Sequence, residues 1–309
     1  MDFLYALEGI RTPALDAVMS AITQLGGEVV YMAVAIIAFW CVSKNLGYYI
    51  LTTGFAGTVF NQFLKITCRV DRPWVRDPDF TIVESARAEA TGYSFPSGHT
   101  QNAFATFGCL GMWSRKTLWR ALCLLVIVLI AFSRMYLGVH TPADVGVSFV
   151  AGLVLTLALW PLFRDIDKHP RRMYGVLGSM LGLSLAYLCY VELFPFPDGT
   201  DAENLASALE NGYKLFGACV AMLTAYIVDH RHIHFDTRAP LAGQILKCVL
   251  GLALVMAIRS GLKSPLYALF GEGGVADAVR YFLTVIFAAA IWPMTFRWFA
   301  RVGGGRRSK

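Results

Sequence analysis

The chain has little charge for its length. Only 16% of its 309 residues are Asp, Glu, Lys or Arg, whereas 56% are hydrophobic. Soluble domains carry roughly 25% charged and about 45–50% apolar residues, so the composition excludes an ordinary soluble protein. The same shortage of charge and excess of Leu, Val, Ala and Phe exclude disorder, collagen, a coiled coil and a secreted disulfide scaffold. We therefore expect a membrane protein.

The sequence also lacks paired cysteines, internal repeats and low-complexity tracts. Its seven cysteines show no CxxC spacing, and most lie in or beside apolar runs. We therefore expect these cysteines to be buried and to pack as small hydrophobic residues. The absence of a repeat weighs against a transporter, because many transporters are built from repeated halves. The net charge of +6 is weak support for a nucleic-acid partner, since membrane proteins concentrate Lys and Arg on the cytoplasmic side.

Long apolar runs predict an all-α polytopic membrane protein with about nine spans, each roughly 17–25 residues long. The runs are at 27–43, 46–64, 98–114, 119–137, 143–163, 173–194, 212–229, 241–260 and 277–297. Residues 1–25 instead place apolar residues at helical spacing with charges between them, which predicts an amphipathic helix in the interface. The expected domains are this interfacial helix, a six-helix core at 26–194 and an extension of about three helices at 195–309.

The distribution of Lys and Arg predicts the orientation. Alternate connections are basic and should be cytoplasmic, whereas the connection at 195–211 has four acidic residues and no Lys or Arg. One external region, 65–87, breaks this pattern because it contains five cations. The orientation of the membrane spans does not explain these five cations, so we expect them to have another role.

Three short polar clusters interrupt the first half of the chain. They are Lys65 with Arg72-Pro73, then Pro96-Ser97-Gly98-His99, then Ser133-Arg134 with His140 and Asp144. A loop or two helix crossings separate successive clusters, so all three emerge on one face of the membrane. They can therefore converge on one site.

The cations of these clusters predict an anion-binding pocket. Lys65, Arg72 and Arg134 need a counter-anion, and guanidinium groups match phosphate oxygens bidentately. Ser97 and Gly98 stand just before an apolar run, where a helix N-terminus offers free N–H groups and a positive dipole end. The expected ligand is a tetrahedral oxyanion.

Two histidines supply what phosphoryl transfer without a metal needs, a nucleophile and an acid for the leaving oxygen. Asp144 follows His140 by four residues, so its carboxylate can hold the imidazole Nδ1–H and present Nε2 as the attacking atom. His99 is left as the general acid. Thr141-Pro142-Ala143-Asp144 also fits a capping box with proline at the first helical position, so Asp144 has a structural alternative compatible with the catalytic one.

These residues resemble the type 2 phosphatidic acid phosphatase (PAP2) superfamily. The resemblance covers roughly residues 12–165 and matches every position of the three signatures. The matched residues are Lys65, Arg72, Pro73, Pro96, Ser97, Gly98, His99, Ser133, Arg134, His140 and Asp144.

The resemblance implies a PAP2-like catalytic core in which His140 forms a phosphohistidine. His99 would protonate the leaving group and then activate water, and no metal or other cofactor would be required. The residues implied to hold the phosphate are Lys65, Arg72, Ser97, Gly98 and Arg134.

Membrane embedding argues for a lipid phosphate, hydrolysed at the outer, non-cytoplasmic interface while its tail stays in the bilayer. The resemblance allows isoprenyl phosphates or diphosphates, glycerolipid phosphates such as phosphatidic acid and phosphatidylglycerophosphate, and sphingoid base phosphates. One alternative is phosphotransfer to another lipid or sugar by the same phosphohistidine. Another is a non-enzymatic transporter or scaffold. The oligomeric state does not follow from the sequence.

Other polar residues have simpler interpretations. Arg69, Arg76 and Arg87 are expected to form a surface that attracts lipid headgroups. The alternating histidines at 230, 232 and 234 suggest a metal site, but a solvated loop is the preferred interpretation, because interleaved Arg231 disfavours a cation. Cations at the external helix ends of the second half are expected to snorkel or to contact a headgroup; they are Arg259, Lys263 and Arg280.

Overall fold

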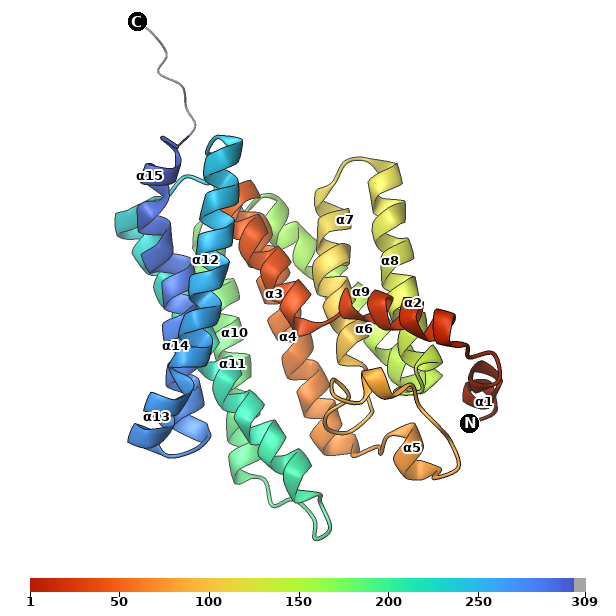
Figure 1. The fold of residues 1–309 in the computed structure, drawn as a ribbon. Helices are drawn as coiled ribbons and strands as arrows, with labels where there is room; N and C mark the ends of the chain where they lie inside the picture. Colours follow the sequence, from red (N-terminus) through yellow and green to blue (C-terminus); the bar gives the residue numbers. More distant parts are fainter. Residues whose placement is uncertain (303–309) are drawn as a thin grey trace, which may run out of the picture. The chain divides into compact units, whose positions relative to one another are not determined.

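The computed structural model describes residues 1–302, and all regular secondary structure in that range is helical (Figure 1). The all-α prediction is confirmed. The first-half helices are α1 (Asp2–Glu8), α2 (Pro13–Gln24), α3 (Glu28–Ile37), α4 (Lys44–Cys68), α5 (Pro73–Arg76), α6 (Gly98–Ala103), α7 (Cys109–Trp113), α8 (Thr117–Tyr136) and α9 (Pro142–Arg164). The later helices are α10 (Arg171–Leu193), α11 (Ala202–Val228), α12 (Leu241–Gly261), α13 (Lys263–Phe270), α14 (Gly274–Ile286) and α15 (Phe296–Phe299).

Short π-helical and 3-10 segments extend or join these helices. The π-helical segments are η1 (Ala38–Val42), η3 (Phe104–Gly108), η5 (Asp229–Ile233) and η6 (Phe287–Ile291). The 3-10 segments are η2 (Glu84–Ala86), η4 (Ile166–Lys168) and η7 (Trp292–Thr295).

Six helical stretches in residues 1–302 are long and apolar enough to cross a membrane, which confirms a multi-pass membrane protein. They are Thr117–Tyr136, Pro142–Arg164, Arg171–Leu193, Ala202–Ile233, Leu241–Phe270 and Gly274–Phe299. The pair Pro13–Gln24 and Glu28–Val42, bent by 43°, would add a seventh if it were one span.

Three of the nine expected spans are not among these six: 27–43, which belongs to the bent pair, and 46–64 and 98–114, which are also helical. The 25-residue helix α4 buries polar side chains, including Thr52, Thr53 and Asn61, inside the protein. The stretch at 98–114 is divided into α6, η3 and α7 and also buries Gln101. Polar groups that face the protein interior lower the hydropathy of α4, whereas the stretch at 98–114 is helical only over 98–113 and is shorter than the roughly 17–25 residues of a span.

The single amphipathic helix expected at 1–25 is two helices, α1 and α2. Thr12 caps α2 by accepting from the backbone N–H of Leu15, and Pro13 occupies the first helical turn, so helix initiation at this point separates α2 from α1. Both helices contact α8, and α2 lies across it (Figure 1). The interfacial location of this segment stays a prediction.

Contacts divide the chain into two compact units. Unit 1 contains Met1–Val34, Tyr49–Asp165 and Pro195–Ala208, and unit 2 contains the remainder. Consequently α3, α4 and α11 each contribute residues to both units. All three polar clusters lie in unit 1. The domain boundaries expected at residues 25 and 194 stay predictions.

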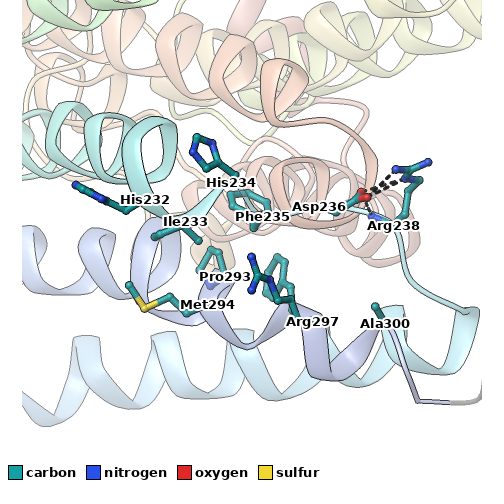
Figure 2. Close-up of a pocket in the computed structure, with 11 residues that line it drawn as sticks. His232, Ile233, His234, Phe235, Asp236, Arg238, Pro293, Met294, Arg297 and Ala300 are labelled. Atoms are coloured by element: carbon teal, nitrogen blue, oxygen red, sulfur yellow. Dashed lines mark hydrogen bonds and ion pairs between the residues drawn. The ribbon is translucent and has the colours of Figure 1, made fainter.

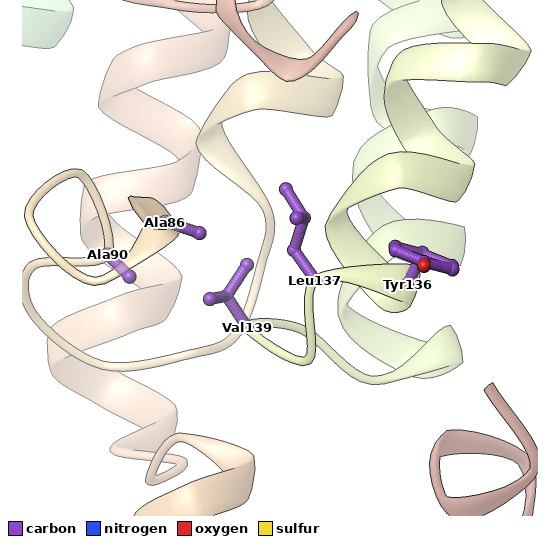
Figure 3. Close-up of a cluster of buried hydrophobic side chains, with 5 residues drawn as sticks. All are labelled: Ala86, Ala90, Tyr136, Leu137 and Val139. Atoms are coloured by element: carbon purple, nitrogen blue, oxygen red, sulfur yellow. The ribbon is translucent and has the colours of Figure 1, made fainter. Parts of the chain in front are cut away.

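A small apolar cluster in unit 1 supports the turn between α8 and α9. Its buried members are Ala86, Ala90, Tyr136, Leu137 and Val139. Leu137 and Val139 point toward the two alanines, whereas Tyr136 points away from them (Figure 3). The backbone N–H of Val83 also donates to the Leu137 carbonyl at 3.1 Å. The turn is therefore held against the loop that precedes α6.

In unit 2, α12 and α14 contact each other, and α13 packs against both. A Cβ at Gly217 of α11 would lie 2.1 Å from the Ala278 carbonyl oxygen of α14, so glycine is needed for this close helix approach. The expectation of buried cysteines holds for Cys109, Cys123 and Cys219. It is wrong for Cys189, which lies on an exposed face of α10.

Candidate active site

The three polar clusters are presented by helix ends and loops of unit 1. Lys65 lies in the last turn of α4, and Arg72 is the residue before α5. Ser97 is the N-cap of α6, and Arg134 lies in the last turn of α8. His140 follows in the turn before α9. Residues up to 79 positions apart in the sequence are thus brought to one region.

Arg72 contacts His140 directly. Its Nη1 lies 3.0 Å from His140 Nε2, and both side chains are buried. Because a guanidinium has no acceptor, Nε2 must accept this hydrogen bond. The proton of the neutral imidazole is then on Nδ1, so the interaction fixes the tautomer that carries a lone pair on Nε2.

The expected contact between His140 and Asp144 is only partly formed. His140 Nδ1 lies 3.5 Å from Asp144 Oδ2, and Nδ1 has no hydrogen-bond partner among the described residues. Oδ2 instead accepts from Ser94 Oγ at 2.6 Å and from the Thr141 backbone N–H at 2.7 Å. The expected Nδ1–H hydrogen bond is therefore not formed in the structure: the carboxylate faces the imidazole, but its near oxygen already accepts from Ser94 and Thr141.

The capping box expected from the sequence is present. Thr141 accepts from the Asp144 backbone N–H, and the Asp144 carboxylate accepts from the Thr141 backbone N–H. Asp144 therefore starts α9 while it faces His140. The helix cap and the expected catalytic contact are therefore compatible with each other in this one side chain.

Arg134 is fully buried and only partly satisfied. Its Nη1 donates to Thr23 Oγ1 at 2.8 Å, whereas Nε and Nη2 have no partner within residues 1–302. A buried guanidinium with unpaired N–H groups is costly. An incoming phosphate oxygen would satisfy these donors, as in the bidentate geometry of arginine and phosphate.

One segment, Glu89–Ser94, contacts a residue of each signature. The carbonyl oxygens of Thr91 and Gly92 accept from Arg72, at 2.8 Å and 3.0 Å, and the Tyr93 carbonyl accepts from Lys65 Nζ. Ser94 Oγ donates to Asp144, as described above. The loop thus orients Lys65 and Arg72 through backbone carbonyls. Because carbonyls carry no formal charge, the positive charge of these two side chains is not neutralised.

Glu89, the first residue of this segment, pairs with His99 of the second signature. Its Oε2 lies 2.9 Å from His99 Nε2. The hydrogen bond from His99 lowers the pKa of Glu89 to about 2, so this carboxylate is ionised at neutral pH. The sequence interpretation did not include Glu89, and its position ten residues before His99 gives no periodic signal.

Ser97 and Gly98 begin α6 as expected. Ser97 accepts from the Thr100 backbone N–H and is fully buried. Its own N–H donates to the Asp144 carbonyl at 3.1 Å, which ties the second signature to the third. A Cβ at Gly98 would meet nothing within 4 Å, so the start of this helix has open space beside it.

Two glycines allow the close approaches on which this arrangement depends. Gly138, in the turn before His140, has φ +82°, and a Cβ there would lie 2.8 Å from Arg11 Nη2. A Cβ at Gly26 would lie 2.9 Å from the His99 carbonyl oxygen. Larger residues would displace the turn or the start of α6.

The electrostatics favour an anion. Burial first, and then the charges of Arg72, Arg134 and Lys65, hold the pKa of His140 well below its ordinary value. Burial likewise lowers the pKa of Arg72 to about 10, which still leaves it charged at neutral pH. The imidazole is therefore neutral beside a group of cations, a state suited to a nucleophile that receives a phosphate.

Other cations singled out in the sequence have different outcomes. Arg69 donates to Thr200 Oγ1 at 3.0 Å, and Arg87 pairs with Glu84, so these two side chains have partners within the protein, and their expected contact with headgroups stays a prediction. Arg280 is buried and pairs with Asp277 rather than snorkelling. Burial favours an ion pair over a free charge.

The alternating histidines also differ from expectation. They lie in and just after the helical segment η5 rather than in a solvated loop, although all three are exposed. Within residues 1–302 no group of three or more His, Cys, Asp or Glu side chains could hold a metal ion. His230 instead stacks on Tyr226 with ring centroids 5.7 Å apart.

Comparison with known proteins decides the family. The model of the PAP2 superfamily matches residues 44–168, and the model of the PAP2 superfamily phosphatase transmembrane extension matches residues 213–303. The chain is 33% identical over 162 residues to undecaprenyl-diphosphatase BcrC of Bacillus subtilis, covering 50% of this chain and 79% of that protein. The chain belongs to the PAP2 superfamily. It is accordingly a phosphoric ester hydrolase with a multi-pass membrane body.

Two other relatives are named for substrates of different classes. The chain is 27% identical over 175 residues to phosphatidylglycerophosphatase B of Bacillus subtilis, which covers 53% of this chain and 80% of that protein. It is 31% identical over 197 residues to dihydrosphingosine 1-phosphate phosphatase of Schizosaccharomyces pombe, over 58% of this chain and 47% of that protein. No solved structure matches the chain.

Proposed function

We propose that this PAP2 enzyme hydrolyses a lipid phosphate monoester or diphosphate through a phosphohistidine at His140. The observation that carries the proposal is the contact of the buried His140 Nε2 with Arg72, beside the unpartnered donors of Arg134. A neutral imidazole with its lone pair on Nε2 is the form that attacks phosphorus. The surrounding uncompensated cations supply the charge that a phosphate needs.

In the first step, Nε2 attacks the terminal phosphorus as its bond to the leaving oxygen breaks. The leaving oxygen is the lipid oxygen of a monoester or the bridging oxygen of a diphosphate. Arg72 donates to Nε2 in the structure, so this N–H must turn to a phosphate oxygen before the attack. Arg134 Nε and Nη2, Lys65 and the N-terminus of α6 at Ser97 and Gly98 hold the remaining oxygens. Positive charge on the phosphorylated imidazole is stabilised by Asp144, which faces Nδ1.

His99 exchanges the proton in both steps. It protonates the leaving oxygen, and then removes a proton from the water that attacks the phosphohistidine, which releases inorganic phosphate and restores neutral His140. Glu89 engages Nε2 of His99, so Nδ1 is the nitrogen left for the reacting oxygen. Burial and the charge of Arg134 lower the pKa of His99 to about 4, and the Glu89 carboxylate opposes this shift. Glu89 therefore favours the protonated imidazole that the first step requires.

The substrate is a lipid because the relatives named above act on lipid phosphates and the chain is a membrane protein. A site at headgroup level meets phosphates that are anchored by their tails and still has access to water. An isoprenyl diphosphate, a glycerolipid phosphate and a sphingoid base phosphate each correspond to a relative's name. These three substrate classes define the panel to be tested.

We place the reaction at the non-cytoplasmic face. The acidic connection expected outside contributes Pro195–Ala208 to unit 1. Within that unit, Thr200 accepts from Arg69, and the Asp201 backbone N–H donates to the Tyr93 hydroxyl at 3.4 Å. The connection without Lys or Arg therefore lies on the same side as the loop that aligns the site, which supports this face.

The test is phosphate release by the detergent-purified protein from the three lipid classes, with EDTA present and His140→Ala in parallel. Release that resists the chelator and is lost in the variant is expected. Release only when a second lipid or sugar is added would replace hydrolysis by phosphotransfer. A strict requirement for Mg²⁺, or full activity in the variant, would overturn the mechanism.

A further inference from the structure

Unit 2 contains a pocket that is lined by both charged and apolar side chains. This pocket of about 420 Å³ is formed by residues 232–238 after α11 and by residues 293–300 at the end of the chain that the structure describes. Its side chains surround a common space from these two segments (Figure 2). None of them belongs to the three signatures, so the catalytic reaction does not account for this pocket.

The pocket lies at one boundary of the predicted membrane spans. The spans Ala202–Ile233 and Gly274–Phe299 both end here, and the span Leu241–Phe270 begins a few residues after the pocket loop. Met294, which lines the pocket, is 57% exposed, and so is Trp298 of α15, which does not line it. Exposed apolar and tryptophan side chains at a span end are typical of the bilayer interface.

The polar lining carries an unpaired cation. Arg238 engages both carboxylate oxygens of Asp236, at 3.0 Å and 3.1 Å from its Nε and at 2.8 Å from Nη2, so these two charges offset each other. Arg297 is exposed, and no hydrogen bond or ion pair involves its side chain within residues 1–302. The formal charge that Arg238, Asp236 and Arg297 give the lining is therefore +1, and His232 and His234 add polar ring nitrogens.

The rest of the lining is apolar, with Ile233, Phe235 and Pro293 beside Met294. An unpaired guanidinium next to apolar side chains suits an amphiphile whose anionic head is followed by an apolar body. Basic pockets at the ends of membrane helices bind lipid phosphate groups for this reason. A ligand with no negative charge would leave Arg297 without a partner.

The pocket loop is held in place by Asp229 at the end of α11. The Asp229 backbone carbonyl accepts from His234 N–H at 2.9 Å, and its side chain accepts from Phe235 N–H at 3.2 Å and from Lys44 Nζ at 2.6 Å. His234 has φ +48°, an uncommon conformation for a residue other than glycine. The surrounding hydrogen bonds maintain this conformation, so the pocket rim is preorganised.

We propose that this pocket binds a phosphate group through Arg297, carried either by an anionic phospholipid of the surrounding membrane or by free inorganic phosphate. Guanidinium and phosphate match in a two-bond geometry. The apolar lining then distinguishes the two sources, because only the lipid can also cover Ile233, Phe235 and Met294. The site is separate in residues from the active site and does not depend on the proposed catalytic mechanism.

The experiment uses the full chain purified in a zwitterionic detergent. Phosphatidylglycerol, phosphatidylcholine and inorganic phosphate are titrated separately, while bound lipid is counted by native mass spectrometry and the melting temperature is followed. The variant is Arg297→Gln, which removes the unpaired cation. The matched control is Arg172→Gln, an exposed arginine of unit 2 that does not line the pocket.

We expect one tight phosphatidylglycerol per chain, with its apparent Kd raised about tenfold by Arg297→Gln and unchanged by Arg172→Gln. A tenfold change corresponds to about 1.4 kcal/mol, the order expected for one charge-assisted contact. Phosphatidylcholine should bind more weakly to every form. A response to inorganic phosphate alone that needs Arg297 would identify free phosphate as the ligand of the same site.

Retention of both responses in Arg297→Gln would overturn the proposal and assign them to the active site or to unspecific lipid contact. Equal binding of phosphatidylcholine and phosphatidylglycerol would also overturn it. Because Arg297 is exposed, the unliganded variant should melt at the wild-type temperature, and a Lys substitution that retains the charge should recover part of the affinity. Lipid hydrolysis in a phosphatidylcholine background should be the same in the Arg297→Gln variant and the wild type.

Discussion

The cations of the candidate site in unit 1 and two cations of unit 2 have different kinds of partner. In unit 1, Arg72 and Lys65 donate to backbone carbonyls and Arg134 donates to a threonine hydroxyl. In unit 2, Arg280 pairs with Asp277, and Lys44 pairs with Asp229, whereas the fully buried Lys247 donates to the carbonyls of Trp40 and Thr237. A carbonyl orients a cation without neutralising it, whereas a carboxylate does both. A carboxylate partner therefore marks Arg280 and Lys44 as cations with a structural role. A carbonyl partner alone does not mark a substrate site, because Lys247 has such partners and lies outside the three signatures.

The largest expected effect is at the nucleophile of unit 1. Because no neighbouring side chain can replace Nε2, His140→Ala should lower the rate of phosphate release by at least about a thousandfold. Single-turnover measurement with a radiolabelled lipid phosphate should show no acid-labile phosphoprotein. A labelled protein in this variant would place the covalent intermediate on another residue. The His230→Ala variant, which alters an exposed histidine of unit 2, is the matched control and should retain full activity.

Asp144→Asn should reduce kcat by about a hundredfold to a thousandfold, because the amide cannot stabilise a positively charged imidazole. It retains the shape of the capping residue, so the melting temperature should change little. A large loss of stability with normal kcat per folded molecule would show that Asp144 acts only as a helix cap.

Breaking the ion pair of unit 2 should affect stability rather than catalysis. Asp277→Asn leaves Arg280 buried without its carboxylate, and removal of one partner of a buried pair costs about 3–5 kcal/mol. Thermal unfolding in detergent should show a clear drop, whereas kcat per folded molecule should match the wild type. The double variant Asp277→Asn with Arg280→Met should recover part of the loss. A reduced kcat in folded protein would mean that the two units are functionally coupled.

Glu89→Gln should reduce kcat by roughly tenfold to a hundredfold, since general acid catalysis contributes about 10²–10⁴ and His99 itself is retained. The carboxylate favours protonated His99, so its removal should also shift the basic limb of the pH profile to lower pH. Glu84→Gln changes a nearby exposed carboxylate that pairs with Arg87 and serves as the control. An unchanged pH profile would mean that Glu89 only positions the loop.

The smallest expected effect is a change in acid stability. The pKa of His140 in the folded protein is well below the ordinary value of 6.5, so above pH 6.5 it is neutral in both folded and unfolded protein. Below that pH the unfolded chain binds a proton that the folded protein does not, and stability falls by up to about 1.4 kcal/mol per pH unit. Melting temperatures between pH 7.5 and 5.5 should decline less steeply in His140→Gln. A slope equal to that of wild type would contradict a depressed pKa at His140.

The membrane class and the residues of the candidate site were predicted from the sequence because both depend on local patterns. Low charge and long apolar runs are properties of composition and spacing, and the eleven signature residues occur in three short clusters. The capping box at Asp144 and the N-cap at Ser97 are likewise local, since each involves residues three positions apart.

Long-range contacts were decided only by the tertiary structure. The pairing of Glu89 with His99, the position of Ser94 on Asp144 and the carbonyls that align Arg72 follow from how one loop packs. Backbone acceptors exist at every residue, so no side-chain pattern marks the ones that are used. Burial also separated Arg280, which has an ion-pair partner, from Arg297, which has none within the described residues. Sequence specifies which charges are present, and packing decides which of them are neutralised.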